Sequence, residues 1–160
     1  MLVYFLRHGI AEDGHPGQPD PERQLTDEGR SKLADVYRRL NKAGIKPALI
    51  LSSPYTRALQ TAELAAKALG CPAAPQTTNC LTPDGSPEGV WDEIRVYREC
   101  ESLLLAGHEP LFSRTITYLL GAPALQVDVK KGSVVAIEIQ SFRGDPRGVL
   151  KWMLTPRLCH

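Results

Sequence analysis

The chain has 160 residues, 42% of them hydrophobic, and its 19 lysines and arginines nearly balance its 18 aspartates and glutamates. This size suits one domain around one hydrophobic core, so we expect a single domain over residues 1–160. The net charge of +1 argues against a nucleic-acid-binding surface, and no apolar run reaches the roughly 18 residues that span a bilayer. We therefore expect a cytoplasmic protein that binds neither nucleic acid nor membrane.

Apolar runs rich in branched residues alternate along the chain with longer segments of helical period. The expected strands are 2–6, 48–52, 102–106, 134–140 and 149–154. The expected helices are 27–42, 55–69, 87–101 and 111–120. This alternation predicts an α/β fold, a three-layer α/β/α sandwich with a mainly parallel central sheet. Only the short link 142–148 separates the last two strands, so we expect them to pair as a hairpin, with an antiparallel strand near the C-terminus.

Two segments lack a regular pattern, 10–24 and 76–88, and both are rich in proline. A loop of about fifteen residues in a compact domain is usually functional or mobile. The first segment directly follows a candidate site, so it is either a lid that faces the substrate or a disordered insertion. Two residues after it stands Thr26, whose hydroxyl, followed by two acids, predicts the start of a helix.

The first strand ends in Arg7, His8 and Gly9. Open α/β sheets bind ligands at the carboxyl ends of their strands, and a strand holds such side chains rigidly. Arginine offers a forked cation that suits phosphate, and a neutral histidine is a nucleophile. This triplet alone is a weak signal, so partners further along the chain decide its meaning.

Two later strands are followed by residues of the same chemistry. Arg57 falls in the first turn of the helix after the second strand, where a cation opposes the helix dipole and an anion is favoured. His108 stands between Gly107, which permits a tight turn, and Glu109, which we expect to cap the next helix. We therefore expect two arginines and two histidines to meet at one edge of the sheet.

Together these segments resemble the histidine phosphatase (phosphoglycerate mutase-like) superfamily, and their order and spacing fit over nearly the whole chain. The motifs are Arg7-His8-Gly9, Leu25-Thr26-x-x-Gly29, Ser52-Ser53-Pro54-x-x-Arg57-Ala58-x-Gln60-Thr61 and Gly107-His108-Glu109-Pro110. Within that superfamily the chain is most similar to SixA-type phosphohistidine phosphatases, through its short length, Arg23-Gln24-Leu25-Thr26 and Leu81-Thr82-Pro83-Asp84-Gly85.

The resemblance implies that His8 attacks phosphorus and becomes phosphorylated, and that water then releases phosphate. Arg7, Gly9, Arg57 and His108 are implied as the phosphate-binding residues, and Arg23 is a further candidate at the mouth of the pocket. The implied partners are a protein that carries phosphohistidine, such as a phosphotransfer domain, and a phosphate or sulfate ion in the pocket. The scheme needs no metal or other cofactor, and the sequence offers no clear cluster of metal ligands.

The chain departs from the wider superfamily where many members place a glutamate that protonates an alkoxide leaving group. Pro83 stands near that position, with Asp84 and Glu88 as possible substitutes or as plain surface acids. An alkoxide leaves poorly without an acid, whereas the imidazole of phosphohistidine can take a proton from solvent. The missing acid therefore favours phosphohistidine as the substrate.

Three alternatives remain open at this point. The first keeps the mechanism with a small phosphomonoester as the substrate. The second is a mutase, which the short chain makes less favourable. The third is a catalytically silent phosphate-binding module, and the full set of Arg7, His8, Arg57 and His108 argues against it.

Overall fold

The computed structural model describes residues 1–159; His160 lies outside the described part of the chain. Its sheet has the strand order β3-β2-β4-β1-β5-β6. The strands are β1 (Leu2–Arg7), β2 (Leu49–Ser52), β3 (Gln76–Thr77), β4 (Ser102–Gly107), β5 (Val134–Ser141) and β6 (Arg147–Leu154). Pairing among β1 to β4 is parallel, and β5 runs antiparallel to both of its neighbours, β1 and β6. The predicted mainly parallel sheet and the C-terminal hairpin are confirmed.

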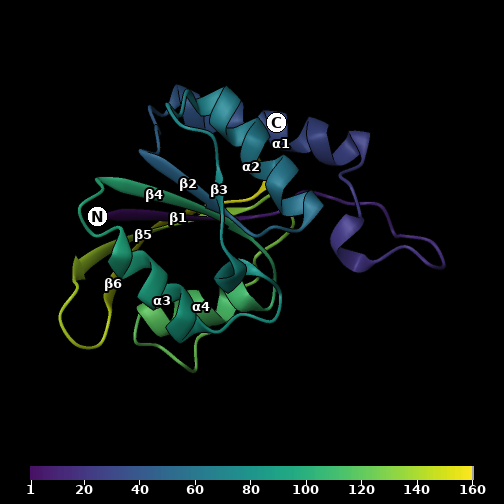
Figure 1. The fold of residues 1–160 in the computed structure, drawn as a ribbon. Coiled ribbons are helices and arrows are strands. Elements are labelled where there is room, and N and C mark those ends of the chain that lie inside the picture. Colours follow the sequence, from purple (N-terminus) through teal and green to yellow (C-terminus); the bar gives the residue numbers. More distant parts are fainter. Residues whose placement is uncertain (160) are drawn as a thin grey trace.

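Helices cover both faces of the sheet (Figure 1). One face carries α1 (Asp27–Lys42) and α2 (Thr56–Leu69), and the other carries α3 (Pro87–Val96) and α4 (Leu111–Leu119). Side chains of a strand alternate between the faces. Accordingly Val3 and Phe5 of β1 pack with α3 and α4, while Tyr4 and Leu6 pack with α1 and α2. The predicted three-layer α/β/α architecture follows from this burial on both sides.

Two predicted elements differ from the structure. The helix expected over 87–101 ends at Val96, and residues 97–100 form turns in which Cys100 N–H donates to the Tyr97 carbonyl. This stretch, Tyr-Arg-Glu-Cys, offers little apolar surface to bury, and β4 begins only two residues later. Strand β3 was not predicted, because it has two residues, both polar and exposed. Each of the other predicted boundaries lies within two residues of the observed one, a difference that is common at helix and strand ends.

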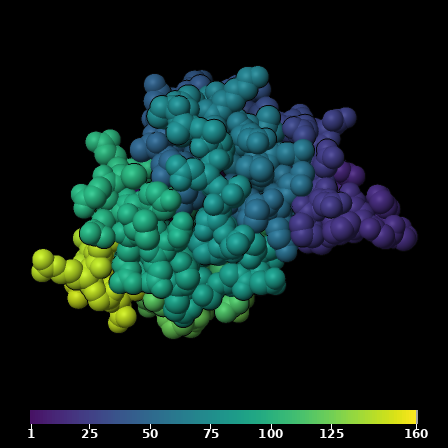
Figure 2. Space-filling view, viewed as in Figure 1, coloured from purple at the N-terminus to yellow at the C-terminus, as the bar shows by residue number. Residues whose placement is uncertain are grey.

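The segment 10–24 folds back on itself instead of forming a structureless insertion. Ala11 pairs with Leu25 as an isolated bridge, and Glu12 N–H donates to the Gln24 carbonyl at 2.8 Å. Between these ends lies a short 3-10 helix, η1 (Asp20–Glu22). The segment forms the purple protrusion at one side of the molecule (Figure 2). Helix α1 begins where expected, because Thr26 Oγ1 accepts a hydrogen bond from Gly29 N–H at its first turn.

Within residues 1–159, none of the helices has the length and apolar character required to cross a bilayer.

Candidate active site

The four predicted site residues meet at the carboxyl edge of the parallel strands. Arg7 ends β1, His108 follows β4, and Arg57 lies in the first turn of α2, which follows β2. Backbone hydrogen bonds join these strand ends, because His8 N–H donates to the Gly107 carbonyl at 2.9 Å. His8, Arg57 and His108 are buried, with exposed fractions of 6%, 4% and 1%. The burial of Arg57 agrees with the expectation that this cation serves to bind an anion and is not a solvated surface residue.

A backbone carbonyl determines the proton position on His8. The Nδ1 atom lies 2.7 Å from the carbonyl oxygen of Gly9. A carbonyl only accepts hydrogen bonds, so Nδ1 carries the proton and Nε2 keeps its lone pair. The Nε–H of Arg57 approaches that lone pair over 3.4 Å, a long hydrogen bond. His8 therefore presents a nucleophilic nitrogen toward the guanidinium of Arg57.

The terminal nitrogens of Arg57 are engaged by Asp20 of η1. Arg57 Nη1 donates to the Asp20 backbone carbonyl at 3.0 Å, and Nη2 donates to its carboxylate at 3.2 Å. The other carboxylate oxygen of Asp20 accepts from Arg23 Nε at 2.8 Å. Asp20 thus engages both terminal nitrogens of the buried arginine, one through its backbone carbonyl and one through its carboxylate, at the position where an arginine binds a phosphate.

Two buried nitrogens at the site have no hydrogen-bond partner within residues 1–159. They are Arg7 Nε and His108 Nδ1. Another nitrogen of the Arg7 guanidinium, Nη1, donates to the Val129 carbonyl at 2.8 Å. Buried polar atoms are nearly always paired in native proteins, so two orphans at one site indicate a ligand that carries oxygen acceptors.

Ser53 holds the second histidine. Its Oγ lies 2.9 Å from His108 Nε2 and accepts from the Tyr55 N–H at 3.2 Å. The ring of Tyr55 packs edge-on against His108, with the ring centroids 5.1 Å apart. The rings of His8 and His108 are also 5.1 Å apart, so one tetrahedral anion can contact both.

Burial keeps both imidazoles neutral. It lowers the pKa of His8 from 6.5 to about 4, and the charges of Arg57 and Arg7 act in the same direction, although the hydrogen bond to Gly9 opposes them. Burial also lowers the pKa of His108 to about 3, assisted by His8 and Arg57. Near pH 7 the site therefore combines two neutral histidines with two permanent cations, which suits the binding of an anion and attack on it.

Comparisons with known proteins agree with this geometry. The model of the histidine phosphatase superfamily (branch 1) matches residues 3–81, a range that includes Arg7, His8 and Arg57. The chain belongs to the histidine phosphatase superfamily. A relative from Picosynechococcus, an uncharacterised protein, is 36% identical over 147 residues, which cover 89% of this chain and 88% of the relative.

Solved structures of similar fold include other phosphatases. The protein histidine phosphatase SixA, complexed with tungstate, superposes with a TM-score of 0.87 at 24% identity and 98% coverage of both chains. The mycobacterial glucosyl-3-phosphoglycerate phosphatase complexed with inorganic phosphate gives a TM-score of 0.71 at 19% identity, over 98% of this chain and 99% of that one. The fold of this superfamily member is that of SixA, and membership supports phosphatase activity.

The motif around Arg57 contains a further buried residue, whose role the sequence pattern does not indicate. Thr61 is fully buried; its Oγ1 accepts the Gly9 N–H at 3.1 Å and donates to the Arg57 carbonyl at 2.7 Å. It thereby joins the backbone beside His8 to the first turn of α2. Ser53 and Asp20 were missed as well. Ser53 and Thr61 lie in the quoted motif, whereas only the position of segment 10–24 after Gly9 hinted at Asp20.

The candidates at the periphery of the candidate active site lie outside the group of four. Arg23 donates to the Asp20 carboxylate and, through Nη1, to the Glu12 carbonyl. It is therefore linked to Arg57 through Asp20, which contacts both arginines. Asp84 and Glu88 are exposed, and no hydrogen bond or ion pair joins either to the site within residues 1–159. Glu109 accepts from Ser113 N–H at 2.7 Å, which confirms its predicted role as a cap of α4.

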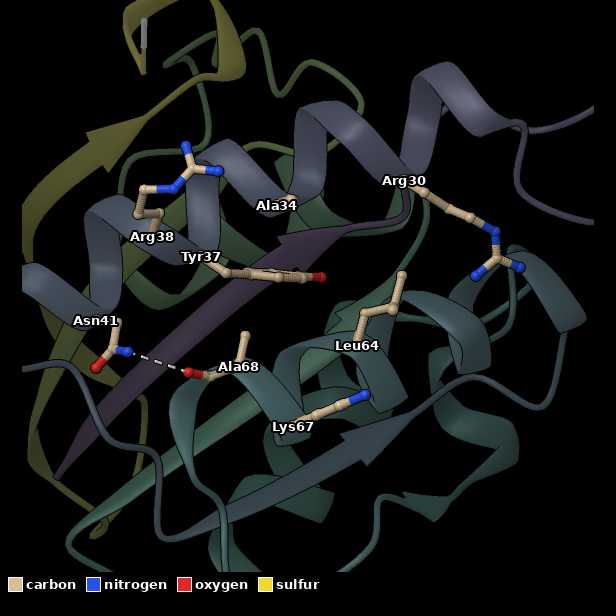
Figure 3. Close-up of a pocket in the computed structure, with 8 residues that line it drawn as sticks. All are labelled: Arg30, Ala34, Tyr37, Arg38, Asn41, Leu64, Lys67 and Ala68. Atoms are coloured by element: carbon tan, nitrogen blue, oxygen red, sulfur yellow. Dashed lines mark hydrogen bonds between the residues drawn. The ribbon is translucent and has the colours of Figure 1, made fainter.

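A separate cavity of about 390 Å³ lies between α1 and α2 (Figure 3). Arg38 and Asn41 of α1 and Lys67 of α2 are among its lining residues. None of Arg7, His8, Arg57 and His108 lines it, so it is distinct from the candidate active site.

Proposed function

We propose that the chain is a phosphohistidine phosphatase that transfers a phosphoryl group from a protein histidine to His8 and then to water. The observation that carries this proposal is the arrangement of His8: its proton is held on Nδ1 by the Gly9 carbonyl, and its Nε2 lone pair faces the buried Arg57. A phosphate-binding module needs cations, but it has no need for a nucleophile whose tautomer is set.

In the first step Nε2 of His8 attacks phosphorus while the bond between phosphorus and the substrate's imidazole nitrogen breaks. The departing ring carries a proton on its other nitrogen, so it leaves as neutral imidazole. The product on the enzyme has a proton on Nδ1 and a phosphoryl group on Nε2. It is an imidazolium that can be displaced in the second step, in which water attacks phosphorus, releases inorganic phosphate and regenerates neutral His8.

The cations and N–H groups around His8 supply the electrostatic part of the mechanism. Arg7 and Arg57 cannot lose their charge near neutral pH, and guanidinium groups bind phosphoryl oxygens with charge-assisted hydrogen bonds. Ser53 Oγ already accepts the Tyr55 N–H, so its own proton is free to donate to His108 Nε2. That arrangement favours a proton on His108 Nδ1, the buried atom without a partner. Losing one such donor to a developing charge typically costs about 2.7–4 kcal/mol.

The carboxylates of the site favour an imidazole leaving group over an alkoxide. Asp20 is the acid that contacts Arg57. Burial raises the pKa of its carboxyl, but the hydrogen bond from Arg23 and the charge of Arg57 outweigh burial and lower this pKa. Asp20 is therefore an anion near pH 7 and a poor proton donor to an alkoxide. Asp84 and Glu88 remain candidates for that acid only if substrate binding brings them closer.

The proposal is tested by replacing His8 with alanine and by comparing substrates. We expect His8→Ala to abolish both turnover and the acid-labile phosphoenzyme while far-ultraviolet circular dichroism stays unchanged. A phosphohistidine peptide should be hydrolysed much faster than a panel of sugar and alcohol phosphates. The opposite preference would identify a small-molecule phosphomonoesterase.

The proposed steps use no metal, so EDTA should leave the rate unchanged. Strong inhibition by EDTA would contradict that part of the proposal.

A further inference from the structure

A second large cavity lies beside the candidate active site. Its volume is about 740 Å³, and Arg7 is one of its lining residues. Arg7 at the end of β1 and Met153 near the end of β6 both line it. These two strand ends lie at the same edge of the sheet, because Val134 of β5 pairs with Leu6 of β1 and with Leu154 of β6. A ligand in this cavity would therefore share Arg7, the residue directly before His8, with the candidate active site.

Cations dominate the lining of this cavity, which we call the basic groove. They are Arg7, Lys32, Lys130, Lys131 and Arg157, with Asp128 as the one lining carboxylate. The whole chain has a net charge of only +1, so positive charge is concentrated here. Apolar side chains, among them Met153, complete the lining.

Ion pairs within the described chain compensate only part of this charge. Lys130 pairs with Asp128 at 2.9 Å and Lys32 pairs with Glu28 at 3.0 Å. Within residues 1–159, no acid lies within ion-pair distance of Lys131 or Arg157. The groove therefore presents cations that a partner can neutralise.

We propose that the basic groove binds an acidic segment of the protein whose phosphohistidine enters the active site. This inference rests on the proposed function and adds the charge of the partner. The cavity is far larger than a phosphate ion, and its cations come from four separate parts of the chain: β1, α1, the segment before β5 and the segment after β6. Such a spread fits an extended acidic segment better than a compact anion. Complementary charge around an interface mainly raises the association rate and selects the partner.

The test uses three substrates and three forms of the protein. The substrates are free phosphohistidine and two synthetic peptides, each with one phosphohistidine, flanked by glutamates in one peptide and by glutamines in the other. The proteins are the wild type, Lys32→Glu with Arg157→Glu, and a control, Arg38→Glu with Lys67→Glu. Arg38 is matched to Lys32, because both lie on α1 and both pair with an acid on the same helix. Arg38 and Lys67 line the other cavity (Figure 3).

At low salt we expect wild-type kcat/KM to be roughly tenfold higher for the acidic peptide than for the neutral one. The groove variant should lose this preference and the control should keep it, while all three cleave free phosphohistidine equally. Equal rates for the two peptides with the wild type would overturn the docking proposal. Loss of activity on free phosphohistidine in the groove variant alone would also overturn it, because the groove would then act on the phosphate itself.

Titration calorimetry separates this proposal from the proposed function. The wild type should bind the unphosphorylated acidic peptide better than the neutral one, and the groove variant should not. If wild-type protein cleaves no phosphohistidine but keeps this binding preference, the proposed function is wrong and the acidic docking surface stands. If the wild type binds both peptides equally, the docking proposal is wrong whatever the activity.

Discussion

The carboxylate of Asp20 lies on the guanidinium of Arg57, with Nη2 and Oδ2 3.2 Å apart, although 36 residues separate them in the chain. Arg57 is buried, whereas the Asp20 side chain is 54% exposed. The candidate active site thus contains an internal anion on one of the two arginines proposed to bind phosphate. A phosphoryl group that binds both terminal nitrogens of Arg57 must displace this carboxylate from Nη2 and the Asp20 backbone carbonyl from Nη1.

Replacing Asp20 with asparagine should tighten the binding of inorganic phosphate. The change removes a competing negative charge and keeps the size of the side chain. An ion pair with one exposed partner contributes at most about 1 kcal/mol, so we expect a gain of up to roughly fivefold in affinity. The inhibition constant of phosphate measures it. Glu22→Gln, on the same 3-10 helix η1, should leave the constant unchanged. Weaker binding by Asp20→Asn would mean that Asp20 positions Arg57 instead of competing for it.

Replacing Thr61 with valine should affect both stability and catalysis. Valine keeps the shape but leaves the buried Gly9 N–H without its acceptor, at a cost of about 1–3 kcal/mol. Because Gly9 also orients His8, we expect kcat to fall. Urea unfolding and steady-state kinetics measure the two effects. Thr115→Val is the matched control: Thr115 is equally buried, but its hydroxyl donates only to the Leu111 carbonyl within α4. A fall of kcat in both variants would indicate a general loss of packing.

Replacing Ser53 with alanine should lower kcat by roughly tenfold, because His108 loses the hydrogen bond that favours a proton on Nδ1. Ser53→Thr restores a hydroxyl and should recover most of the rate. Ser52→Ala is the control, since the buried hydroxyl of Ser52 donates to the Ser53 carbonyl and does not contact His108. Wild-type kcat in Ser53→Ala would show that Ser53 has no part in orienting His108.

Acid should destabilise the protein through its buried histidines. Unfolded histidines bind protons below about pH 6.5, whereas the lowered pKa values of His8 and His108, about 4 and about 3, keep both neutral in the folded state. The unfolded chain thus binds more protons, and stability is lost as the pH falls from about 6.5 toward 4. Each histidine contributes up to about 1.4 kcal/mol per pH unit in that window.

Urea unfolding of the wild type and of His8→Ala between pH 7 and pH 4.5 measures this contribution. As the pH falls, the free energy of unfolding should decrease less steeply in the variant. The two slopes should differ by the contribution of one proton, about 1.4 kcal/mol per pH unit. Identical slopes for wild type and His8→Ala would contradict the burial of a neutral His8.

Local patterns were sufficient to predict most of the fold. Alternating apolar runs located the major strands, and helical periodicity with Thr26 as a cap located α1. The same patterns failed for β3, where two polar residues carry no period, and for the end of α3, where the local sequence still tolerates a helix. The expected convergence of Arg7, His8, Arg57 and His108 was reliable because the carboxyl ends of parallel strands share one edge of a sheet.

The sequence by itself determined which reactive side chains stand at the strand ends, since strand and helix positions follow from local propensity and spacing. The tertiary structure decided their chemical state. The proton position on His8 depends on the Gly9 carbonyl, and the neutrality of both histidines depends on burial. The contact of Asp20 with Arg57 joins segment 10–24 to α2, and no local sequence pattern predicts that these two segments meet. Hydrogen-bond geometry and desolvation arise only when distant segments pack together, and a linear pattern does not contain them.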